Sequence, residues 1–159
     1  MKDSTGFTLF ELVIVLAIIA AMVTVIAPYA SRSNESLELD NRTREIVETL
    51  KYAINLAEID NQRIRFYLDT NRKSFYLETA DEDGHFPLIS TSVGRERYLS
   101  SSCHLMDIEG FEMEGQCCYL EFDPMQSWPS GHFVIFGNEF QKKIEIQSKT
   151  ISITDEGAM

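Results

Sequence analysis

Residues 12–27 read LVIVLAIIAAMVTVIA, an apolar run in which Thr24 is the only polar side chain. The wider stretch 7–30 contains a single charge, that of Glu11. As an α-helix rising about 1.5 Å per residue it would be about 36 Å long, enough to cross a hydrocarbon core of about 30 Å. The sequence therefore predicts an N-terminal helix that can be stored in a membrane.

Three interpretations of this segment compete: a cleaved secretory signal, a plain membrane anchor, and a membrane-stored helix that later packs against other copies. A secretory signal needs a basic start and a small-x-small cleavage site. Only Lys2 precedes the run, beside Asp3, and no Ala-x-Ala occurs in it. A plain anchor does not account for Glu11, because a carboxylate in an apolar helix costs about 2.5–3.5 kcal/mol and normally has a partner charge. We therefore favour the third interpretation.

The residues before the run supply a motif. Residues 1–6 (MKDSTG) form a short polar leader, and residues 6–12 (GFTLFEL) resemble the cleavage and methylation motif of the type IV pilin and type II secretion pseudopilin family. The resemblance implies that a prepilin peptidase cuts after Gly6 and methylates the new amino terminus at Phe7. It also implies that Glu11 acts in assembly, where its carboxylate neutralises the cationic amine of an adjacent subunit in an apolar setting.

A second helical half is predicted beyond the membrane run. Pro28 removes a backbone donor and clashes with the preceding turn, so we expect a kink or a locally melted turn near residues 24–28. Apolar residues then recur at helical spacing through about Asn61, which predicts an amphipathic half over residues 31–61. Its apolar positions are Leu37, Leu39, Ile46, Val47, Leu50, Ala53, Ile54 and Ala57.

From Arg63 onward the hydrophobic period changes to two. Residues 63–68 and 75–78 alternate on either side of a polar turn at residues 69–72, which predicts a β-hairpin. The pattern of residues 84–99 does not indicate which secondary structure they form. Further strands are expected at residues 117–122, 133–136, 144–146 and 151–153.

These elements predict an α+β fold of pilin-like type, one long N-terminal helix whose amphipathic half packs on a C-terminal antiparallel β domain. The expected divisions are residues 1–6 as leader, 7–30 as transmembrane and assembly helix, 31–61 as amphipathic half, and 62–159 as extracytoplasmic β-rich domain. The order of features is most similar to the minor pseudopilin H and FimT-type group. That group usually has a Thr-Gly turn in its last hairpin, where this chain has Gln147-Ser148-Lys149.

The net charge and the absence of known catalytic motifs limit the classes of function that the sequence supports. The net charge is −11 and the pI about 4.6, a balance that repels nucleic-acid backbones. No Gly-x-Ser-x-Gly, His-Glu-x-x-His or phosphate-binding glycine loop occurs, and His85, His104 and His132 are far apart in sequence. The acidic loop 81–83 lacks an ordered calcium-binding pattern. We therefore expect no enzyme activity, no cofactor, no metal and no nucleic-acid partner.

The chain has three cysteines, Cys103, Cys117 and Cys118. Outside the cytoplasm an oxidising environment favours one disulfide, from Cys103 to either of the other two. The alternative is no disulfide, with Cys118 buried as a small hydrophobe on the face shared with Leu120 and Phe122. Both outcomes stay open at this point.

The resemblance implies a non-catalytic minor subunit of a pilus-like filament. The favoured interpretation is a type II secretion pseudopilin that helps export folded proteins. Its partners would be other pseudopilin or pilin subunits, a prepilin peptidase, an inner-membrane assembly platform and membrane lipid. The chain would cross the inner membrane once, with its C-terminal domain in the periplasm. The alternatives are a minor type IV pilin used in adhesion, motility or DNA uptake, and a membrane-anchored binding or enzymatic domain that does not polymerise.

Overall fold

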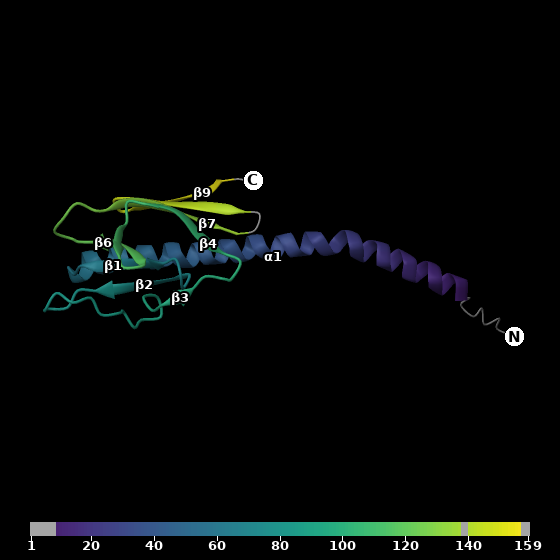
Figure 1. The fold of residues 1–159 in the computed structure, drawn as a ribbon, viewed down its shortest axis with the longest axis horizontal. Coiled ribbons are helices and arrows are strands. Elements are labelled where there is room, and N and C mark those ends of the chain that lie inside the picture. The colour runs from purple at the N-terminus through teal and green to yellow at the C-terminus, as the bar shows by residue number, and fades with distance from the viewer. Residues whose placement is uncertain (1–8, 138–139, 157–159) are drawn as a thin grey trace. The chain divides into compact units, whose positions relative to one another are not determined.

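The computed structural model describes residues 9–137 and 140–156, and the side chains of residues 25–35 and 156 lie outside this description. The chain forms two compact units, residues 1–35 and 36–159. Within the described residues, helix α1 (Leu9–Asp60) precedes nine strands (Figure 1). The strands are β1 (Ile64–Asp69), β2 (Ser74–Thr79), β3 (Arg97–Tyr98), β4 (His104–Glu109), β5 (Glu112–Glu114), β6 (Cys117–Phe122), β7 (Ser130–Phe136), β8 (Gln141–Gln147) and β9 (Thr150–Glu156).

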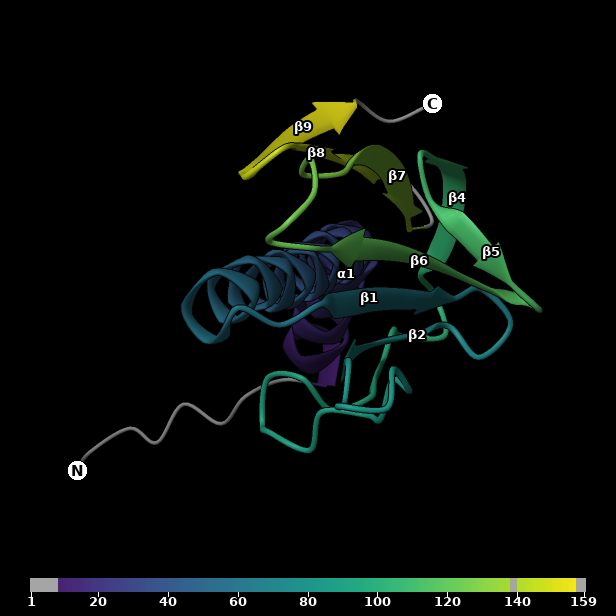
Figure 2. The same ribbon diagram turned by 90° about the vertical axis from the view of Figure 1, so that its left-hand side faces the viewer.

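The strands form two antiparallel sheets. One has five strands in the order β3-β2-β1-β6-β5, and the other has four in the order β4-β7-β8-β9. Around residues 36–60 of α1, strands β7, β8 and β9 lie along one side and β2 along another (Figure 2). A helix followed by antiparallel sheets confirms the expected α+β, pilin-like fold.

The second half of α1 is held by its apolar stripe. Leu39, Ile46, Leu50, Ala53 and Ala57 are buried, at intervals of three, four and seven residues, which place side chains on one face of a helix. The helix ends at Asp60, and the next residue, an asparagine, has a φ of +52°. Asparagine tolerates this left-handed conformation, which is a common way for the chain to leave a helix.

The predicted hairpin forms as β1 and β2. Phe66 pairs with Leu77, and the carboxylate of Asp69 accepts hydrogen bonds from the backbone N–H groups of Asn71 and Arg72, at 2.9 and 2.8 Å. These bonds fix the turn and thereby the register of the two strands. The other edge of β1 pairs with β6, some fifty residues further along the chain, with Phe66 opposite Leu120.

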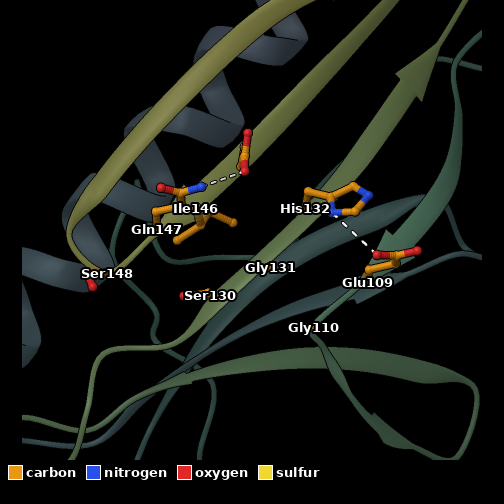
Figure 3. Close-up of a pocket in the computed structure, with 9 residues that line it drawn as sticks. Glu109, Gly110, Ser130, Gly131, His132, Ile146, Gln147 and Ser148 are labelled. Carbon is orange, nitrogen blue, oxygen red and sulfur yellow. Dashed lines mark hydrogen bonds and ion pairs between the residues drawn. The ribbon is translucent and has the colours of Figure 1, made fainter.

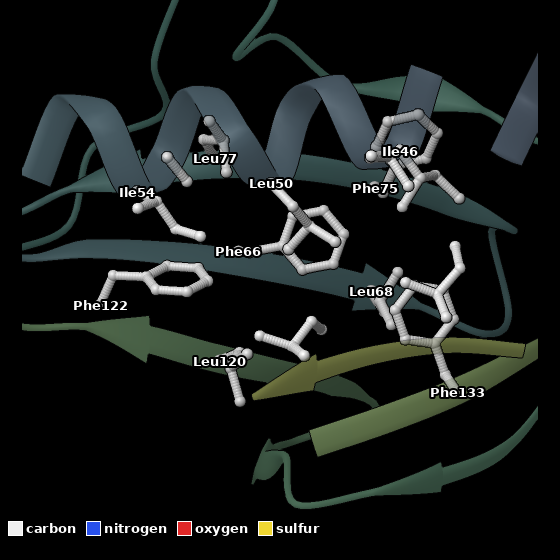
Figure 4. Close-up of a cluster of buried hydrophobic side chains, with 14 of the residues drawn as sticks. Ile46, Leu50, Ile54, Phe66, Leu68, Phe75, Leu77, Leu120, Phe122 and Phe133 are labelled. Atoms are coloured by element: carbon white, nitrogen blue, oxygen red, sulfur yellow. The ribbon is translucent and has the colours of Figure 1, made fainter. Parts of the chain in front are cut away.

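One hydrophobic core joins the two sheets and the helix (Figure 4). The ring of Phe66 lies 6.4 Å from that of Phe75 on the neighbouring strand and 6.5 Å from that of Phe133 in the other sheet. All three rings are fully buried, as are Ile46 and Leu50 from α1. Burying a side chain of this size contributes about 1.5–3 kcal/mol, so these contacts stabilise the packing of the helix on the two sheets.

Strands β3, β4 and β5 were not predicted from the sequence. Strand β4 is interrupted by a register shift between Met106 and Glu109, which breaks the alternation that marks a strand. All of β5 is exposed and two of its three residues are glutamates, so no apolar period identifies it. The expected strands also extend further than their apolar residues, because backbone pairing continues into polar ends such as Ser130 and Gln147.

Candidate functional site

The N-terminal part of α1 carries an exposed apolar surface. Every described side chain from Leu9 to Thr24 is exposed, including Leu9 at 81% and Phe10 at 73%. The large apolar members are Leu9, Phe10, Leu12, Val13, Ile14, Val15, Leu16, Ile18, Ile19, Met22 and Val23. Exposed apolar patches of this extent mark surfaces that bind a membrane or another protein.

Glu11 lies in the first turn of α1 as described, within this apolar surface. The N–H groups of the first turn lack helical partners, and the helix dipole favours a negative charge there. Gly6 and Phe7, the predicted processing residues, lie outside the described residues. The backbone is helical across Pro28, whose side chain is not described, and the kink predicted there stays a prediction.

The three cysteines are free thiols in the structure. Cys103 and Cys118 are buried in the core, and Cys117 is half-buried. Cys118 shares the buried face of β6 with Leu120 and Phe122, as the strand alternation predicted. Burial raises the pKa of all three thiols, that of Cys118 to about 11, so thiolate is scarce at neutral pH.

The outer face of the five-stranded sheet is an aromatic and charged surface. Arg65 on β1 donates to Glu121 at 2.7 Å, and its guanidinium carbon lies 3.6 Å from the ring centre of Phe86 and 4.4 Å from that of Tyr119. Tyr67 stacks on a neighbouring tyrosine of β2 with ring centres 5.0 Å apart. Burial raises the pKa of Tyr67 and keeps its hydroxyl protonated, so that it donates to a glutamate of β5. These contacts tie β1 to β2, β5 and β6 on this face of the sheet.

The structure assembles a cluster of side chains that the sequence alone does not predict. Asp107 and Glu109 on β4 meet His132 on β7. Glu109 and His132 line a cavity of about 440 Å³, and Figure 3 shows their contact; Glu145 lines the same cavity. His132 lies more than twenty residues from both carboxylates, and only the pairing of β4 with β7 brings them together. The sequence signal was an Asp-x-Glu at residues 107–109, which is too common to single out.

Comparisons with known proteins decide the family. A family model described as the prokaryotic N-terminal methylation motif matches residues 1–27. Competence protein ComGC of Halalkalibacterium halodurans is 34% identical over 73 residues, which cover 46% of this chain and 71% of that protein. This chain belongs to the type IV pilin and pseudopilin family.

The fold of this pilin is similar to a solved structure, that of the minor pseudopilin EpsH from the Type 2 Secretion System of Vibrio cholerae. The TM-score is 0.63 at 15% identity, and the match covers 76% of this pilin and 98% of that chain. At this identity the similarity is one of fold, and it supports the helix-then-sheets architecture. Among the described residues of the pilin, no helix combines the length and hydropathy of a membrane span.

Proposed function

We propose that this chain is a non-catalytic minor subunit of a pilus-like filament, and that the filament belongs to a type II secretion system, where the subunit is a pseudopilin that helps export folded proteins. The observation that carries the proposal is the motif of residues 6–12 followed by a helix with an exposed apolar surface and an acid in its first described turn. A prepilin peptidase would cut after Gly6 and methylate Phe7. The apolar run would hold the subunit in the inner membrane until an assembly platform adds it to sibling subunits, with the C-terminal body in the periplasm.

Processing tests this proposal directly. Coexpression with a prepilin peptidase is expected to yield a chain that begins at Phe7, lacks residues 1–6 and carries one added methyl group, as measured by intact-mass spectrometry and N-terminal sequencing. Gly6→Leu is the matched variant, because a bulky side chain at the cut site is expected to leave the chain intact. An unprocessed wild-type chain beside a functional peptidase, or a cut near residues 27–30, would contradict the proposal.

A competence pilin is the second candidate, and the similarity to ComGC favours it. Charge argues against direct DNA binding: residues 1–6 are neutral and Glu11 carries one negative charge, so residues 32–159 carry −10. Deleting the gene distinguishes a secretion pseudopilin from a competence pilin. Loss of protein secretion with unchanged DNA uptake supports the secretion pseudopilin, and the reverse result assigns the subunit to DNA uptake.

A further inference from the structure

The outer face of the four-stranded sheet carries a row of polar side chains across three strands. By register, Glu109 on β4 lies opposite His132 on β7, and His132 lies opposite Glu145 on β8. Residues directly opposite each other on one face of a sheet have Cβ atoms about 4.5–5.5 Å apart. The row therefore places one imidazole between two carboxylates.

The irregularity in β4 adds a third carboxylate. Between Met106 and Glu109 the register shifts, and Asp107 has a φ of +50°. Bulges re-aim side chains, and here Asp107 and Glu109 both reach His132. Ligand atoms of the three residues all lie within 4.8 Å of one another.

The distance between His132 and Asp107 suits a shared metal ion. In a tetrahedral zinc site with ligands about 2.0–2.1 Å from the ion, two ligand atoms are about 3.4 Å apart. The Nε2 atom of His132 and the Oδ2 atom of Asp107 are 3.3 Å apart. The nearer oxygen of Glu109 lies 3.9 Å from Nδ1, the other nitrogen of the same ring. An ion bound at Nε2 beside Asp107 therefore requires the carboxylate of Glu109, which is 71% exposed, to move from Nδ1 toward Nε2.

The charge around the cluster also favours a cation. The residues that line the cavity include Glu109, Glu145 and His132 but neither lysine nor arginine among those that the structure describes. The nearest lysine of this face by register is Lys143, which lies opposite Val134 in the next row. Carboxylates close together repel each other, and a bound cation removes that repulsion.

We propose that Asp107, Glu109 and His132 bind a divalent transition-metal ion, with Zn²⁺ as the representative, and that the ion links β4 to β7. An imidazole with two carboxylates matches the nitrogen and oxygen ligands of zinc, whereas Ca²⁺ and Mg²⁺ take oxygen ligands. Three protein ligands leave a coordination position to water or to a group from a neighbouring molecule. Because the ligands converge only when β4 and β7 are paired, the ion stabilises the folded state.

The test uses the full chain, made without a histidine tag, solubilised in detergent and treated with a chelator. Calorimetric titration with Zn²⁺ is expected to show one ion per chain, and Co²⁺ is expected to give the visible absorption of a protein-bound ion. Asp107→Asn and His132→Gln are each expected to weaken Zn²⁺ binding at least about tenfold. Asn adopts the left-handed backbone conformation of Asp107 readily, so the first variant retains the fold.

His104→Gln is the matched control, because this exposed histidine lies on β4 outside the cluster and its loss is expected to leave the affinity unchanged. Circular dichroism checks that each variant is folded. The proposal is overturned if the folded Asp107→Asn and His132→Gln chains bind Zn²⁺ as the wild type does. It is equally overturned if the wild type binds no Zn²⁺, or if His104→Gln abolishes binding.

Discussion

Glu11 and Cys118 show how the surroundings of a side chain determine its protonation state or the partner that it needs. Glu11 is a carboxylate in an apolar helix surface, where the free energy of burying it is unfavourable unless a cation meets it. Cys118 is a thiol in the core, where burial disfavours the charged form and raises its pKa to about 11. For each residue, the environment sets which protonation state or partner it requires.

The first prediction concerns assembly. Glu11→Leu is expected to be processed normally but to crosslink poorly to sibling subunits in membranes. The methylated amine of a neighbouring Phe7 would lose its counter-charge, and an uncompensated buried charge costs about 3–5 kcal/mol. Thr24→Leu is the control, since the Thr24 hydroxyl donates within its own helix, to a carbonyl at 2.8 Å. Equal crosslinking of Glu11→Leu and wild type would show that Glu11 has no role in assembly.

The second prediction concerns pH. The native Cys118 thiol, with its pKa of about 11, stays protonated above the value of about 8.5 at which an unfolded thiol ionises. Its stabilising contribution is therefore complete below about pH 8.5 and is lost as the pH rises through about 11, at up to about 1.4 kcal/mol per pH unit. Cys118→Ala is expected to remove this component of the pH dependence.

The measurement for Cys118 is denaturant unfolding from pH 7 to 11, followed by the fluorescence of Trp128, the chain's one tryptophan. Cys103 and Cys117 remain in both proteins, so the difference between the two pH profiles reports Cys118 together with its coupling to the adjacent Cys117. Parallel pH profiles for wild type and Cys118→Ala would refute the assignment.

At the scale of elements, the amphipathic half of α1 is tied to the four-stranded sheet by apolar packing and by one lysine. The Nζ atom of Lys142 on β8 lies 2.7 Å from a carboxylate oxygen of Asp40 on α1 and 2.7 Å from one of Asp155 on β9. The side chain of Asp40 is 38% exposed, whereas that of Asp155 is 77% exposed. The helix contact is therefore the less solvated of the two.

The third prediction follows from this difference. Asp40→Asn is expected to lower the free energy of unfolding by about 0.5–1 kcal/mol, and Asp155→Asn by less, because water screens the exposed pair more strongly. In a Lys142→Met background the Asp40 substitution is expected to have almost no effect. Denaturant unfolding of the four chains gives the coupling energy as a double-mutant cycle. An equal loss in both backgrounds would mean that the ion pair does not link helix and sheet.

At the scale of the whole molecule, the two compact units differ in chemistry. Residues 1–35 include the exposed apolar helix surface, and residues 36–159 contain the hydrophobic core and nearly all of the negative charge. The stripe of α1 within residues 36–60 is buried by strands of its own unit. The second unit thus has the parts of a domain with its own core.

The fourth prediction is that residues 36–159 alone form a soluble, acidic monomer. The apolar surface of residues 9–24 is absent from this fragment, and its remaining helix stripe is covered by the sheets. Light scattering after size exclusion is expected to give the monomer mass, and circular dichroism to show mixed helix and strand. A fragment that aggregates, or one that is predominantly helical, would contradict the architecture.

The sequence by itself determined the helix, the motif at its start, the buried stripe of its second half, and the hairpin of β1 and β2. These are local signals, because hydrophobic period and turn chemistry act over a few residues. Only the tertiary structure decided that β1 pairs with β6, that the strands divide into two sheets, and that the exposed β5 is a strand at all. It also brought Asp107 and Glu109 to His132. The alternation of apolar and polar residues shows which side chains share a face of a strand. The pairing partner of each strand depends instead on which apolar faces pack together, and these faces are distant in sequence.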